Sequence, residues 1–168
     1  MTIPTLYTDR LILRPYRRAD FDAYAALLAS PRADHMDGPH DPPVAWAWFT
    51  NDIASWGLYG FGHLAVEHQG RLAGFVGASQ PPQFPLPEFG WCLMGHAEGQ
   101  GIAFEAARAL LAHVFATTPM TSIVSNIGPE NSRSIALAKR LGAVPDPDAP
   151  RPEGDDCIVY RHSRKDGA

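Results

Sequence analysis

The chain has 168 residues, of which 45% are hydrophobic and 19% charged. This composition is that of an ordinary globular protein with one core and excludes a disordered chain. The formal net charge of −4 argues against nucleic acid as a partner, because nucleic-acid binders usually carry a basic patch. No run of roughly 18 apolar residues or export signal is found, so we expect no membrane span and a cytoplasmic protein.

Apolar spacing in the first half of the chain predicts three strands and two helices. The run RLILRPY at 10–16 predicts a strand, and helical spacing predicts helices at 17–30 and 44–56 with a loop, 31–43, between them. Two further strands, at 63–68 and 71–79, flank a Gln-Gly turn and predict a β-hairpin.

The second half alternates strands and helices. We expect strands at 88–94, 121–127 and 157–162, helices at 102–117 and 131–142, and an acidic, proline-rich loop at 145–156. The resulting order, β-α-α-β-β-β-α-β-α-β, predicts a single α/β domain over residues 1–168. Its start is mostly antiparallel, and a βαβ unit lies inside it.

A glycine-rich turn, HAEGQGIAFEA at 96–106, stands between a strand and a helix. Free backbone N–H groups at a helix N-terminus attract anions, and glycine lets a phosphate approach the backbone closely. The stretch therefore has the form of a pyrophosphate site. The alternative is a turn that needs glycine only for its backbone angles.

Other chemistry-bearing patterns are lacking. The sequence has neither an H-E-x-x-H motif nor paired C-x-x-C motifs, so we expect no metal. Cys92 and Cys157 are far apart in apolar stretches and are expected to be buried free thiols.

Four stretches, in order along the chain, resemble motifs of the GCN5-related N-acetyltransferases (GNAT), in the branch of the ribosomal-protein N-terminal acetyltransferases. They are TDRLILRP at 8–15, EFGWCL at 88–93, EGQGIAFEA at 98–106 and ENSRSIALAKRLGA at 130–143. The resemblance implies a mixed, mostly antiparallel sheet of about six or seven strands. It also implies that the central parallel strands splay apart and that about four helices flank the sheet.

The resemblance further implies acetyl-CoA as co-substrate and a set of residues that hold it. The backbone of the strand end would pair with the pantetheine arm, the glycine turn would bind the pyrophosphate, and an asparagine would reach the arm from the next helix. These positions are Leu93, Met94, Glu98, Gly99, Gln100, Gly101, Ile102, Ala103 and Asn131. By residue type alone, Asn131 is a helix N-cap, and both roles are compatible.

Direct transfer to an amine needs a base for the amine and an acid for the leaving thiolate. Many family members use a tyrosine as the acid, but Ala138 stands at that position here. Ser134 is the alternative acid, against a structural role in which its hydroxyl bonds back to its own helix. Glu88 is the first candidate base, acting through water, or else a solvated strand-end carboxylate. Glu153 and Asp155 are the fallback bases.

The resemblance also indicates where the acceptor amine would bind. The resemblance implies that the first two helices and their loop wall the acceptor pocket, which makes His35, Met36 and Trp46 candidate contacts. Glu98 departs from the family's usual Gln or Arg, and a carboxylate there repels a pyrophosphate unless it points away.

We therefore expect an N-acetyltransferase that moves an acetyl group from acetyl-CoA to a primary amine, either a protein N-terminus or a small molecule, as a monomer or homodimer. A non-catalytic acetyl-CoA-binding or regulatory domain of the same fold is the alternative.

Overall fold

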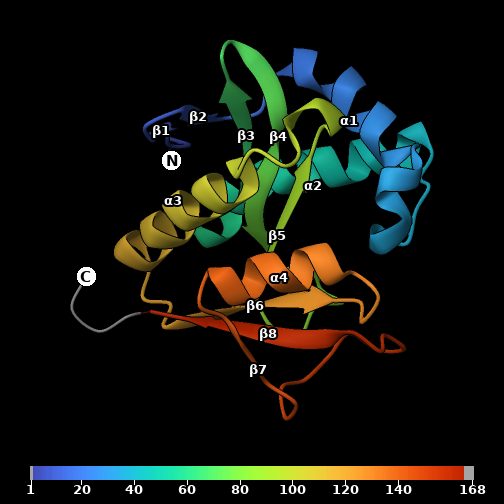
Figure 1. The fold of residues 1–168 in the computed structure, drawn as a ribbon, viewed down its shortest axis with the longest axis vertical. Helices are drawn as coiled ribbons and strands as arrows, with labels where there is room; N and C mark the ends of the chain where they lie inside the picture. The colour runs from blue at the N-terminus through green and yellow to red at the C-terminus, as the bar shows by residue number, and fades with distance from the viewer. Residues whose placement is uncertain (1, 165–168) are drawn as a thin grey trace.

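The computed structural model describes residues 2–164, and their strands form one eight-stranded sheet in the order β1-β2-β3-β4-β5-β6-β8-β7 (Figure 1). The strands are β1 (Leu6–Tyr7), β2 (Leu11–Arg14), β3 (His63–His68), β4 (Arg71–Ser79), β5 (Glu88–Leu93), β6 (Ser122–Ile127), β7 (Val144–Pro145) and β8 (Ile158–Ser163). The helices of eight or more residues are α1 (Phe21–Leu28), α2 (Pro42–Tyr59), α3 (Ile102–Thr117) and α4 (Ser132–Arg140). Three 3-10 helices are also described, η1 (Arg18–Asp20), η2 (Pro31–Met36) and η3 (Gly95–Ala97).

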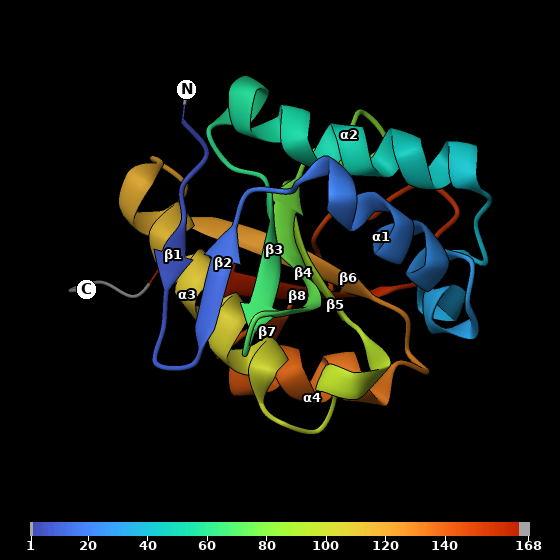
Figure 2. The ribbon, with the colours of Figure 1, turned by 90° about the horizontal axis from the view of Figure 1, so that it is seen from above.

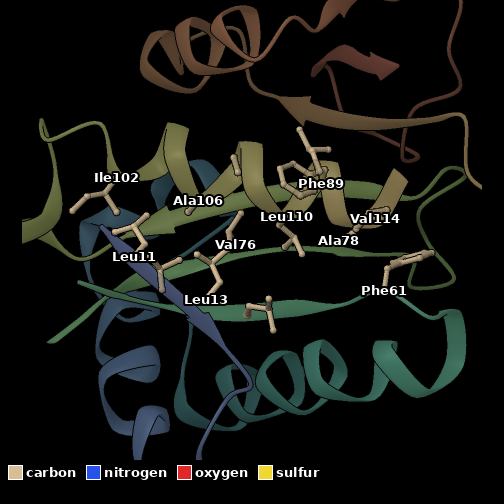
Figure 3. Close-up of a cluster of buried hydrophobic side chains, with 14 of the residues drawn as sticks. Leu11, Leu13, Phe61, Val76, Ala78, Phe89, Ile102, Ala106, Leu110 and Val114 are labelled. Carbon is tan, nitrogen blue, oxygen red and sulfur yellow. The ribbon is translucent and has the colours of Figure 1, made fainter. Parts of the chain in front are cut away.

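The helices cover the sheet in two layers. Seen from above, α1 and α2 lie on one face of the sheet and α3 and α4 on the other (Figure 2). The main core lies between the strands and α3, whose inward face carries Ile102, Ala106, Leu110 and Val114 (Figure 3). A second, aromatic core around Phe49 lies beneath α1 and α2.

The predicted hairpin at 63–79 and the predicted helix at 102–117 are both confirmed to the residue. β3 and β4 pair antiparallel around a turn in which Gln69 has a φ of 52° and Gly70 a φ of 73°. Two consecutive positive φ values define the turn that matches the twist of a two-residue hairpin. Helix α3 spans 102–117 as expected.

The predicted splay between the parallel strands is also confirmed. β5 and β6 share a single register pair, Glu88 with Val124, and every other pairing in the sheet is antiparallel. Just beyond that pair, the Ser125 hydroxyl donates to the Phe89 carbonyl at 2.6 Å. A side chain thus replaces the next ladder bond, and the two strands separate from there on.

The hydroxyl of Ser125 also contacts a buried histidine, His162. The Ser125 hydroxyl has one proton and gives it to Phe89, so His162 Nε2, 3.0 Å away, donates to Ser125. Burial lowers the pKa of His162 to about 4, which keeps the imidazole neutral. Its Nδ1 has no hydrogen-bond partner within residues 2–164.

The structure differs from the sequence prediction in the second helix and at the sheet edges. Helix α2 begins at Pro42, where the Asp41 side chain caps it, and the expected 31–43 loop contains η2. Ala45, Phe49 and Trp56 of this helix are buried, whereas Val44 and Trp48 are each 38% exposed. The two-residue strands β1 and β7 were not predicted, because so short a strand leaves no alternation to detect.

Both cysteines are free thiols, with Cys157 buried and Cys92 half-buried. From residue 2 to residue 164, no helix combines the length and the apolar character that crossing a membrane requires.

Candidate functional site

The splay leaves one edge of β5 without a strand partner. The Met94 N–H donates to Ala73 of β4, and backbone groups alternate between the two sides of a strand. The polar backbone groups of Trp91 and Leu93 therefore turn toward β6, where the register has already ended. This exposed edge can accept an extended ligand as an added strand. We call this edge of β5, at Trp91 and Leu93 where it faces β6 without pairing to it, the slot. Of the two residues expected to pair with the pantetheine arm, Leu93 faces the slot with its backbone and Met94 does not.

The glycine turn closes one end of this slot. Gly99 and Gly101 have φ values of 72° and 74°, a conformation that side chains with a β-carbon rarely adopt. A β-carbon at Gly99 would meet nothing within 4 Å, so open space lies above the backbone there. Gly101 is the N-cap of α3 and supplies no side chain, which leaves the first N–H groups of the helix, including those of Ile102 and Ala103, free to bind an anion.

The turn is anchored from the far end of the chain. The Thr8 hydroxyl donates to Glu105 at 2.5 Å, and Arg10 Nε donates to the same carboxylate at 2.7 Å. Arg10 also donates through Nη1 to the Gln100 carbonyl at 3.1 Å. Burial acts to raise the pKa of Glu105, but these hydrogen bonds hold it below its ordinary value. The TDRL motif at 8–11 thus holds the glycine turn in place through Glu105 and Gln100. The sequence alone did not predict this contact.

Glu98, the acidic residue in front of the turn, is neutralised by two arginines. Its Oε2 lies 2.9 Å from Arg133 Nη2 on α4, and its Oε1 forms an ion pair with Arg32 of η2. The hydrogen bond from Arg133 is the main reason that the pKa of Glu98 lies below its ordinary value. Arg32 also donates through Nε to the Leu93 carbonyl at 3.2 Å, so it sits on the edge of the slot.

Helix α4 presents the expected asparagine and serine. Asn131 is the N-cap, and its Oδ1 accepts from the Ser134 N–H at 3.1 Å, which leaves its amide NH₂ available. The Ser134 hydroxyl is half-buried, and in the part of the chain that the structure describes it does not bond back to its helix as Ser55 and Thr117 do. Ala138, at the tyrosine position, is fully buried.

Glu88 stands at the point where the slot begins. The pKa of Glu88 is raised to about 7, mainly because burial removes the carboxylate from water; the charge of Asp155 adds to the rise, and hydrogen bonding by Asn126 opposes it. Asn126 Oδ1 is buried and has no partner within residues 2–164. A carboxyl group with a pKa near neutrality is suited to take a proton from an amine.

The candidate acceptor residues divide into two groups. Met36 packs on the same cluster as Cys92 and Met94, next to β5. His35 is exposed, and Trp46 is 43% exposed on the outer side of α2, where its ring contacts Phe21 edge-on.

A buried polar cluster lies beneath this side of the sheet. Tyr16 and Tyr24 each donate to Asp52 Oδ2 at 3.2 Å, and His63 Nδ1 lies 3.5 Å from the same oxygen. Burial raises the pKa of Asp52. The cluster ties the segment after β2 to α1, α2 and β3.

Comparisons with known proteins agree with this geometry. An acetyltransferase from Agrobacterium tumefaciens str. C58 is 42% identical, with a TM-score of 0.93 over 98% of this chain and 96% of the other. A putative GNAT-family acetyltransferase from Bordetella pertussis is 28% identical, with a TM-score of 0.80 over 96% and 100%. RimL, a ribosomal L7/L12 alpha-N-protein acetyltransferase in complex with coenzyme A, shares the fold at 19% identity, with a TM-score of 0.74 over 96% and 97%. The profile of the acetyltransferase (GNAT) domain matches residues 10–144, and the chain therefore belongs to the GNAT acetyltransferase family.

Proposed function

We propose that the protein transfers an acetyl group from acetyl-CoA directly to a primary amine. The observation that carries this proposal is the unpaired edge of β5, which ends at a glycine turn with free helix N–H groups. A slot that offers strand pairing at one end and anion binding at the other suits an amide-containing arm joined to a pyrophosphate.

The described residues fit acetyl-CoA in charge and in shape. Open space above Gly99, the uncapped start of α3 and two nearby arginines suit its phosphates. The backbone of Leu93 and the amide NH₂ of Asn131 suit its pantetheine arm. Bound acetyl-CoA supplies the activated thioester, and the protein supplies orientation and proton transfer.

Two side chains carry the proton transfers in this proposal. Glu88 accepts the proton that the amine loses, directly or through water, which its pKa of about 7 supports. Ser134, whose hydroxyl is not tied to its own helix within the described residues, protonates the leaving thiolate. Neither step needs a covalent enzyme intermediate.

Protein N-termini and small amines are both proposed as acceptors. Sequence resemblance to the ribosomal-protein branch and the shared fold of RimL support including N-terminal peptides. Met36 and the half-buried Cys92 offer an apolar wall beside β5.

The test is an acetylation screen of N-terminal peptides, polyamines, amino acids and aminoglycosides with acetyl-CoA. Thiol release would be followed together with the mass of the product. An amine that gains one acetyl group while CoA is released supports the proposal. Tight acetyl-CoA binding with no turnover across the panel would instead favour a non-catalytic acetyl-CoA-binding domain.

A further inference from the structure

A three-residue charge cluster, Arg32, Glu98 and Arg133, joins three separate segments at the mouth of the slot. Arg32 comes from η2, Glu98 from the turn before α3, and Arg133 from the first turn of α4. One carboxylate between two guanidinium groups leaves a net charge of +1. The side chains are 35%, 28% and 72% exposed, in that order, so an incoming ligand can reach them.

The cluster already binds an anion, but one that belongs to the chain itself. Guanidinium groups bind carboxylates and phosphates with the same planar fork of N–H donors. Glu98 directly precedes Gly99, so this carboxylate lies next to the turn that points free N–H groups toward a ligand. A fixed carboxylate there repels a phosphate, whereas two arginines released from it attract one.

We propose that Glu98 occupies, in the ligand-free protein, the place of an acetyl-CoA phosphate, and that Arg133 and Arg32 exchange Glu98 for that phosphate when acetyl-CoA binds. The inference rests on the proposed function and assigns two phosphate ligands to the same site. The cations in front of the glycine turn thus come from α4 and η2, and the turn itself contributes an acid.

The exchange has a second consequence at Leu93. Arg32 donates to the Leu93 carbonyl from the same guanidinium group that pairs with Glu98. When a phosphate draws Arg32 away, this carbonyl becomes free to accept a hydrogen bond from the pantetheine arm. Arg32 is therefore a phosphate ligand that also covers the slot edge until the co-substrate arrives.

Isothermal titration tests the exchange with three ligands that differ in their phosphates. Acetyl-CoA carries the pyrophosphate and the 3′-phosphate, acetyl-dephospho-CoA lacks the 3′-phosphate, and S-acetylpantetheine carries neither. The variants are Arg133→Gln, Arg133→Lys, Glu98→Gln and Arg32→Gln. Arg151→Gln, an exposed arginine on the loop before β8, is the charge-matched control.

Arg133→Gln should weaken acetyl-CoA binding about tenfold, the value of one charge-assisted hydrogen bond, and leave S-acetylpantetheine unchanged. Arg133→Lys should show a smaller loss. Glu98→Gln should tighten acetyl-CoA binding severalfold, because the competing carboxylate is gone. Arg32→Gln should tighten S-acetylpantetheine, because Leu93 is uncovered. A loss that persists with acetyl-dephospho-CoA assigns the pyrophosphate, and one confined to acetyl-CoA assigns the 3′-phosphate.

Equal weakening of acetyl-CoA and S-acetylpantetheine by Arg133→Gln would overturn the exchange, as would Glu98→Gln weakening acetyl-CoA as strongly as Arg133→Gln does. Melting curves of each variant check that it is folded. Wild-type protein that binds and turns over acetyl-CoA, while Arg133→Gln binds it equally well, refutes only this inference. Wild-type protein that binds none of the three ligands refutes the proposed function as well.

Discussion

Replacing Glu88 by glutamine should stabilise the protein at alkaline pH while removing the proposed base. The folded state holds the pKa of Glu88 at about 7, against an ordinary value of 4.5. A carboxyl group whose pKa is raised by folding favours the folded state below pH 4.5, and this contribution is lost as the pH rises through about 7. At pH 8 the ionised Glu88 therefore costs about 3 kcal/mol, and at pH 5 about 1 kcal/mol.

Glutamine has a similar shape and no charge, so it should remove this cost. For a chain of this length, 3 kcal/mol corresponds to a rise in melting temperature of roughly 6–12 °C at pH 8. The rise at pH 5 should be about a third of that. Circular dichroism melts of both proteins at the two pH values measure the difference. An equal shift at pH 5 and pH 8 would refute the raised pKa.

The activity of the same variant should change in the opposite direction. In the wild-type protein, kcat/KM should fall about tenfold per pH unit below pH 7 as Glu88 becomes protonated. Glu88→Gln should lose this acidic limb together with most of its turnover. Asp155→Asn removes a negative neighbour that raises the pKa of Glu88, so it should move the limb to lower pH. Asp156→Asn, an exposed change on the same loop, is the matched control and should leave the limb in place.

Three further substitutions probe the proposed acid, the anchor of the glycine turn and the splay. Ser134→Ala should lower kcat by about 100-fold and leave acetyl-CoA affinity unchanged. The exposed Ser132→Ala is the control and should change neither kcat nor affinity; unchanged turnover in Ser134→Ala would refute its proposed role as the acid. Glu105→Gln should destabilise the protein by about 1–3 kcal/mol in urea unfolding, since it weakens the charge-assisted bonds to the N-terminal hairpin; a loss under 0.5 kcal/mol, about that of a neutral surface change, would contradict the anchor. Ser125→Ala should cost a similar amount by leaving the Phe89 carbonyl unpaired, and a stability equal to wild type would show that the hydroxyl does not hold the strands.

Local patterns in the sequence predicted the elements that local forces determine. The β3–β4 hairpin and helix α3 carry clear alternation and clear helical spacing, and both were located to the residue. Helix α2 shows where this reasoning fails. Val44 is more hydrophobic than Ala45, yet Val44 is 38% exposed and Ala45 is fully buried. Close packing against α1 selects a small side chain, and hydropathy carries no information about the space available.

The candidate site depended on contacts that the sequence cannot reveal. A glutamate at position 98 would repel a phosphate if no cation lay beside it. Arg32, which pairs with Glu98, lies 66 positions earlier in the chain, so the sequence does not reveal the pair. The link between Thr8 and Glu105 spans 97 positions. Both members of that link lie in motifs that resemble the family, but a motif records which residues are present and not which of them touch.

The buried Ala138 has a consequence for redesign of the site. Its methyl group packs with Ala143, Ile127 and Tyr160, and Trp91 lies against the same cluster. A tyrosine placed at 138 alone would have to displace these side chains, and overpacking of this kind typically costs about 1–3 kcal/mol. Volume could be balanced by pairing Ala138→Tyr with Tyr160→Ala. A tyrosine at position 138 is thus two substitutions away from the present sequence, and either substitution alone leads first through a poorly packed intermediate.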